Sequence, residues 1–82
     1  MKFDLFSTVI LARDLPESNF QRGDVATIVE QIPGNSTQEN GYLLEVFDAS
    51  GNTLDVISVF ESEIELPKPN AVVNYREYEK TA

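Results

Sequence analysis

The strongest structural signal in the chain is the stretch YLLEVFDASGNTLDVISVF at residues 42–60. Two runs rich in β-branched and aromatic residues, 42–47 and 54–60, flank a polar segment that contains Gly51. Such runs are typical of β-strands, and glycine supplies the left-handed backbone that tight turns require. Because the Asp48 side chain can also bond to its own turn, we predict a β-hairpin with Gly51 in a left-handed conformation.

Three further segments extend the β pattern outward from this hairpin. The apolar and β-branched composition predicts strands over residues 5–12 (LFSTVILA), 25–32 (VATIVEQI) and 63–66 (EIEL). A single helical turn centred on Glu63 fits the connection to the last strand. No helical periodicity separates these segments, so the sequence predicts an all-β protein.

Five short strands with a tight turn between the third and fourth favour a small five-stranded SH3-like barrel. An OB fold usually runs longer and carries a helix at that connection. Pro67 and Pro69 end the sheet because proline cannot donate to a β ladder. We therefore predict a barrel over residues 1–66 and a C-terminal extension over residues 67–82, called the tail below.

Two motifs carry a resemblance to a known family. They are DLPESNFQRGDVATIVE at residues 14–30 and Y-x-x-E-x-x-D-A-x-G-x-T-L at residues 42–54. Over about residues 3–66 the chain resembles the small bacterial family of domain of unknown function 4926 (DUF4926). The resemblance implies an SH3-like barrel related to KOW-type modules, and it implies no activity. The family's glycine falls on Asn19, which tolerates a left-handed backbone best after glycine.

The composition excludes several chemistries. The 82 residues contain no Cys and no His, which removes disulfides, thiolate metal sites and the commonest general base. A domain of this size also has no room for a sizeable catalytic cleft. Glu61, Glu63 and Glu65 alternate and could hold a divalent cation on a strand, but such rows more often protect a solvated edge. We expect no catalytic activity, no cofactor and no metal.

The charge is uneven along the chain. Residues 1–66 hold twelve acidic side chains against Lys2, Arg13 and Arg22, whereas the tail is slightly basic. An acidic body repels nucleic acid and anionic lipid and suits a basic protein partner. The N-terminal residues lack a signal-peptide pattern and no apolar stretch is long enough to span a membrane, so we expect a cytoplasmic protein without membrane contact.

These observations predict a non-catalytic protein–protein interaction module, namely a small acidic accessory, inhibitor-like or immunity-like subunit. Its partner would be another protein, basic in character, or a second copy. By the pattern of the family that the chain resembles, Tyr42, Leu44 and Val46 point into the barrel, so Leu43 and Phe47 are expected to point out. The inward face of residues 54–60 stays open, because it depends on the residue count of the turn. The tail, through Val73, Tyr75 and Tyr78, is expected to dock displaceably on the surface of Leu43 and Phe47, of its own barrel or of a neighbour's. A KOW-like nucleic-acid or ribosome-associated module and a structural homodimer remain as alternatives.

Overall fold

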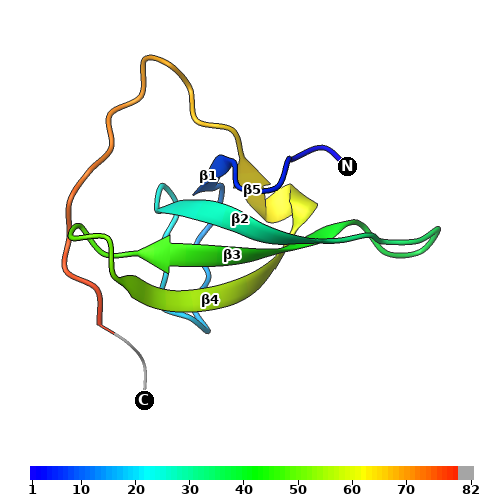
Figure 1. The fold of residues 1–82 in the computed structure, drawn as a ribbon, viewed down its shortest axis with the longest axis horizontal. Helices are drawn as coiled ribbons and strands as arrows, with labels where there is room; N and C mark the ends of the chain where they lie inside the picture. The colour runs from blue at the N-terminus through cyan, green and yellow to red at the C-terminus, as the bar shows by residue number, and fades with distance from the viewer. Residues whose placement is uncertain (80–82) are drawn as a thin grey trace.

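The computed structural model describes residues 1–79 and contains one antiparallel sheet curled into a half-barrel (Figure 1). The strands are β1 (Thr8–Leu11), β2 (Val25–Ile32), β3 (Gly41–Phe47), β4 (Thr53–Phe60) and β5 (Ile64–Glu65), with a 3-10 turn η1 (Glu61–Glu63) before β5. Their order across the sheet is β4-β3-β2-β1-β5. This arrangement confirms the all-β, SH3-like prediction. The helical content of residues 1–79 is this single turn, which cannot cross a membrane.

Two of the strands are shorter than predicted, each for a local reason. Strand β1 begins at Thr8 rather than Leu5, because Phe6 has a left-handed backbone (φ 63°) that a continuous strand cannot contain. The N–H of Phe6 donates instead to the carbonyl of Ile28 at 2.7 Å. Strand β5 has two residues because Glu63 belongs to η1, in agreement with the helical turn predicted there.

The predicted hairpin joins β3 and β4. Gly51 has a φ of 88°, and a carboxylate oxygen of Asp48 accepts the N–H groups of Ser50 and Asn52, each at 2.9 Å. These backbone donors, that of Asn52 above all, lower the pKa of Asp48 below its usual value. The connection between β1 and β2 has the second predicted left-handed residue, Asn19, at φ 60°.

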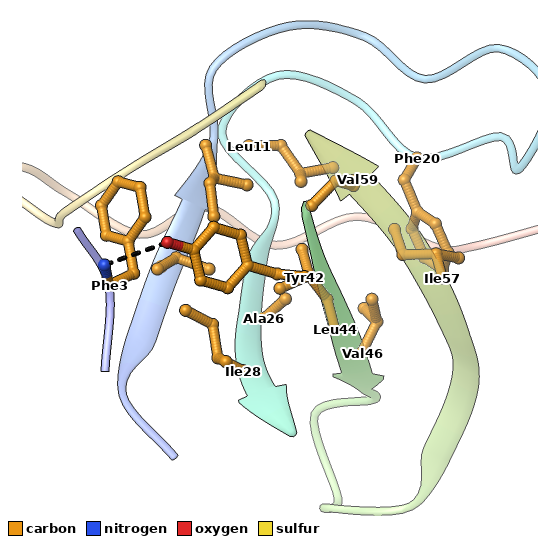
Figure 2. Packing of buried hydrophobic residues seen from close by; sticks show 12 residues of the cluster. Phe3, Leu11, Phe20, Ala26, Ile28, Tyr42, Leu44, Val46, Ile57 and Val59 are labelled. Atoms are coloured by element: carbon orange, nitrogen blue, oxygen red, sulfur yellow. Dashed lines mark hydrogen bonds between the residues drawn. The ribbon is translucent and has the colours of Figure 1, made fainter. Parts of the chain in front are cut away.

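The core lies on the concave face of the sheet (Figure 2). As predicted, Tyr42, Leu44 and Val46 of β3 are buried there. Across the hairpin, Tyr42 lies opposite Val59, and Leu44 lies opposite Ile57, so these β4 residues also face inward. The sequence left the orientation of β4 open. The remaining buried residues come from β1, β2, β5 and two loops, and are Phe3, Val9, Leu11, Phe20, Ala26, Ile28 and Ile64.

A register shift explains why Leu54, an even-numbered residue of β4, packs against the core. Asp55 pairs with Val46, but the next pair is Thr53 with Phe47, which leaves Leu54 as an extra residue in β4. Leu54 is half-buried and packs against the core. The shift places it inward with Ile57 and Val59, while the even-numbered positions beyond it face solvent.

Strand β4 is also one edge of the sheet. Two of its backbone N–H groups donate to carboxylates rather than to a strand: that of Val56 to Asp55 and that of Phe60 to Glu63, both at 2.8 Å.

A polar cluster closes the end of the barrel next to Phe3. The Tyr42 hydroxyl donates to Glu61 at 2.5 Å and accepts the N–H of Phe3 at 3.2 Å. Asn40 adds a second donor to Glu61 at 3.3 Å. Burial, and then the hydrogen bond to Glu61, raise the pKa of Tyr42, while the Tyr42 hydrogen bond lowers the pKa of Glu61.

Candidate interaction site

The convex face of β3 and β4 carries exposed apolar side chains. Phe47 is 40% exposed, as predicted, and Leu43 is half-buried. The structure adds two neighbours from β4, Val56 at 48% and Phe60 at 44% exposure. We call Leu43, Phe47, Val56 and Phe60 the outer face.

The outer face lies in a strongly acidic environment. Glu45 lies between Leu43 and Phe47 on β3 and directly opposite Val56, and Glu30 of β2 is opposite Leu43. The sequence has no Lys or Arg from residue 23 to residue 67, whereas this stretch has nine acidic residues. The apolar side chains of the outer face therefore lie beside Glu30 and Glu45, and within residues 1–79 neither carboxylate forms an ion pair.

The tail forms neither strand nor helix over residues 67–79. It leaves the barrel after β5 and runs along one side of it, past the β3–β4 turn (Figure 1). Its apolar side chains are mostly in solvent, with Val72 at 92%, Val73 at 71% and Tyr75 at 78% exposure. Tyr78 differs, because it is half-buried and packs against the core.

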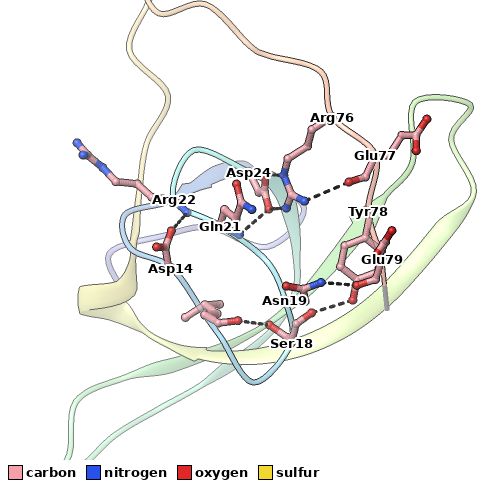
Figure 3. Close-up of polar contacts among 11 residues, drawn as sticks. Asp14, Ser18, Asn19, Gln21, Arg22, Asp24, Arg76, Glu77, Tyr78 and Glu79 are labelled. Carbon is pink, nitrogen blue, oxygen red and sulfur yellow. Dashed lines mark hydrogen bonds and ion pairs between the residues drawn. The ribbon is translucent and has the colours of Figure 1, made fainter. Parts of the chain in front are cut away.

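Tyr78 anchors the tail to the connection between β1 and β2 (Figure 3). Its ring stacks on Phe20, with centroids 4.4 Å apart and planes 6° apart. Its hydroxyl donates to the backbone carbonyl of Ser18 at 2.8 Å. Burial and the negative charge of Asp55 raise the pKa of the Tyr78 hydroxyl, which favours its neutral form, the form that can donate a hydrogen bond.

Arg76 supplies a second anchor two residues earlier. Its guanidinium contacts both carboxylate oxygens of Asp24, with Nε 3.2 Å from Oδ1 and a terminal nitrogen bonded to Oδ2. The side-chain amide of Asn19 donates to the backbone carbonyl of Glu79. The bidentate pairing matches the fork geometry of arginine, which a lysine could not reproduce.

An open groove of about 790 Å³ lies between the tail and the β3–β4 turn. Four of the five predicted partner-binding residues line it, namely Phe47, Val73, Tyr75 and Tyr78. Leu43 does not. The tail thus contacts the barrel, but its anchors rest on Phe20 and Asp24 rather than on the convex surface between Leu43 and Phe47. Whether these residues bind a partner stays a prediction.

Phe20 and Asp24 were missed by the sequence reasoning as members of the site. The sequence did hold one signal for this site, because Phe20 is a large apolar residue inside a mostly polar connection. It is 2% exposed in the structure.

The three alternating glutamates have separate partners. Glu61 accepts from Tyr42, Glu63 accepts the N–H of Phe60 and lies 3.7 Å from Arg13, and Glu65 lies in β5 opposite Ile10. They do not share the face of one strand, because the first two belong to η1. Within residues 1–79, no three acidic side chains come close enough together to hold a metal ion.

Comparison with known proteins finds a family match for the barrel. The sequence model of a family described as Domain of unknown function (DUF4926) matches residues 5–66. No curated protein and no solved structure matches the chain. The matched segment covers all five strands and ends immediately before the tail.

Proposed function

The chain belongs to the family described as Domain of unknown function (DUF4926), and we propose that it acts as a non-catalytic protein–protein interaction module. In this proposal it is a small acidic accessory or inhibitor-like subunit of the cytoplasm. Its partner is a protein with a basic surface.

The outer face is the observation that carries this proposal. Val56 and Phe60 are about half exposed on β4, and Glu45 of β3 lies opposite Val56, in a stretch without Lys or Arg. Exposed apolar side chains supply the buried contact of an interface, and the surrounding carboxylates favour a basic partner and repel an acidic one. Nucleic acid and anionic membranes fall in the repelled class.

The two alternatives make different demands on the surface. A KOW-like nucleic-acid module needs a basic patch, but Arg13 is paired with Glu63 and the Lys2 ammonium lies 5.4 Å from the ring centroid of Phe3. A homodimer built on the outer face would bring two acidic surfaces together, which costs free energy. Both considerations favour a basic protein over these alternatives.

The test compares two full-length variants with the wild-type chain. Val56→Thr/Phe60→Ser removes apolar contact area from the outer face, and Val72→Ser serves as the control because Val72 is 92% exposed in the tail. Proteins captured from the native cell by the wild type are purified and titrated against all three chains. We expect a basic partner whose affinity falls by about tenfold or more for the outer-face variant, falls with added salt, and is unchanged for the control.

An affinity that is equal for the outer-face variant and the control would contradict the proposal. Capture of nucleic acid, or of a second copy alone, would favour one of the two alternatives.

A further inference from the structure

We propose that the surface beneath the tail is a second, separate recognition site, and that its ligand is a segment of another protein containing arginine followed two positions later by tyrosine. In this view residues 76–78 occupy the site as an internal stand-in for that ligand. The site consists of Ser18, Asn19, Phe20 and Asp24, and we call it the loop site.

The contacts of the tail define what the loop site selects. Asp24 binds the guanidinium of Arg76 in a bidentate pair, and the ring of Phe20 stacks on the ring of Tyr78. The carbonyl of Ser18 accepts a hydrogen bond from the hydroxyl at the end of that ring, which distinguishes tyrosine from phenylalanine. The residue between the two anchors, Glu77, is exposed, so it contributes little to selection.

The loop site is organised by bonds that do not involve the tail. Leu15 and Phe20 form an antiparallel bridge, and the N–H of Ser18 donates to the carbonyl of Leu15 at 3.1 Å. The N–H of Gln21 donates to Asp24 at 2.7 Å, which fixes that carboxylate. The recognition groups therefore keep their places when the tail leaves, and no ordering of the loop has to accompany binding of a ligand.

The tail is attached in a way that allows exchange. Between Leu66 and Val73 the chain is exposed and forms one turn bond, from the N–H of Ala71 to the carbonyl of Lys68. Among the described residues of the tail, Arg76, Tyr78 and the carbonyl of Glu79 hold the segment to the loop. Such a tether gives the tail a high effective concentration but few contacts, so a foreign segment with the same two anchors can replace it.

Charge complementarity identifies the class of ligand. Asp24 and Asp48 line the groove beside the tail, and within residues 1–79 the cationic residue that lines it is Arg76 of the tail itself. A ligand that displaces the tail must replace this charge. The loop site therefore fits a segment whose arginine can pair with Asp24 and whose tyrosine can stack on Phe20.

The experiment uses the full chain and a labelled peptide of residues 71–79, AVVNYREYE, as the probe. Fluorescence anisotropy measures its binding to the wild type, to Tyr78→Ser, which releases the tail, and to Tyr75→Ser. The last variant is the matched control, because it removes an equally large but 78% exposed ring from the same segment.

We expect Tyr78→Ser to bind the peptide about tenfold or more tightly than the wild type and Tyr75→Ser do, since its own tail no longer competes. Adding Asp24→Asn to Tyr78→Ser should abolish that gain. A peptide with alanine in place of its arginine, or serine in place of its second tyrosine, should not bind. If Tyr78→Ser does not fold, Arg76→Ala releases the other anchor and takes its place.

Two results would overturn the proposal. The first is a folded, tail-released variant that does not bind the peptide, or that binds it equally well with Asp24→Asn. The second is a wild-type dimer by light scattering that Tyr78→Ser converts to monomers, which would assign the loop site to a second copy.

This inference shares with the proposed function only the idea that the chain binds proteins. Val56→Thr/Phe60→Ser leaves the loop site intact and should bind the peptide as the wild type does, so failure of one proposal is distinguishable from failure of the other.

Discussion

The hydroxyl of Tyr42 donates a hydrogen bond of 2.5 Å to the carboxylate of Glu61, which joins the central strand β3 to the turn η1. The same hydroxyl accepts the N–H of Phe3, so one buried tyrosine connects three separate parts of the chain.

This bond predicts a loss of stability in acid. The pKa of Glu61 is lower in the folded state than in the unfolded chain, so the stability it contributes is present above its ordinary pKa of about 4.3 and is lost as the pH falls through the folded value. Thermal melts between about pH 7 and pH 3 measure this loss. Tyr42→Phe keeps the ring and removes the hydroxyl, so we expect a smaller loss for that variant.

Asp48 contributes to the same acid response through a different set of bonds, because its pKa is also lowered. For this reason the difference between the wild type and Tyr42→Phe, rather than the wild-type curve alone, isolates the contribution of Glu61. Parallel curves for the two chains would show that the Tyr42 hydrogen bond does not stabilise the carboxylate.

Gly51 is a position where the backbone alone decides the effect of substitution. At φ 88° nothing lies within 4 Å of an added Cβ, so a side chain there meets strain but no clash. We expect Gly51→Val to reduce the free energy of unfolding by about 1–2 kcal/mol. Gly51→Asn is the control and should cost less, since asparagine tolerates this conformation. Urea unfolding measures both, and an unchanged midpoint for Gly51→Val would contradict the turn assignment.

Gly34 presents the opposite case. A Cβ there would lie 2.1 Å from the carbonyl oxygen of Gln38 and 2.6 Å from that of Glu39, so the loop would have to move. We expect Gly34→Ala to cost about 1–3 kcal/mol, in the range of overpacking, and Ser36→Ala in the same exposed loop to cost almost nothing. Thermal melts of the two variants separate these outcomes.

The acidic barrel predicts that duplex DNA and RNA do not bind. Twelve acidic residues against three basic ones in residues 1–66 repel phosphate rather than release its counterions. Gel shifts at physiological salt should show no complex at concentrations of about 1 µM, which corresponds to about −8 kcal/mol. A complex at that concentration would contradict this prediction and would favour the KOW-like nucleic-acid module over the protein-binding module.

Local sequence signals were sufficient for most of the sheet. The turn around Gly51 is a short-range pattern, and the structure has it. The inward orientation of Tyr42, Leu44 and Val46 was implied by the family resemblance, because both faces of residues 42–47 carry apolar side chains. The orientation of β4 was not predictable, because it depends on one extra residue, Leu54, inside the strand. A single inserted residue reverses every later side chain, and composition alone does not reveal it.

The position of the tail was beyond prediction for a different reason. Tyr78 and Phe20 are far apart in the chain, and neither belongs to a strand. Their stacking depends on how the connection between β1 and β2 folds back over the core. The aromatic and β-branched residues of the tail predicted that it would contact the barrel, but the contact surface required knowledge of which loop residue was buried.

The carboxylates that accept backbone N–H groups of β4 have a consequence for how a binder can approach this edge of the sheet. Asp55 and Glu63 already occupy the N–H groups of Val56 and Phe60, so an added strand would have to displace two side chains before it could form a ladder. This cost disfavours β-augmentation at the β4 edge, and it disfavours polymerisation through that edge for the same reason. A designed ligand for this protein should be a helix or loop laid across the sheet, with arginine and lysine around an apolar centre.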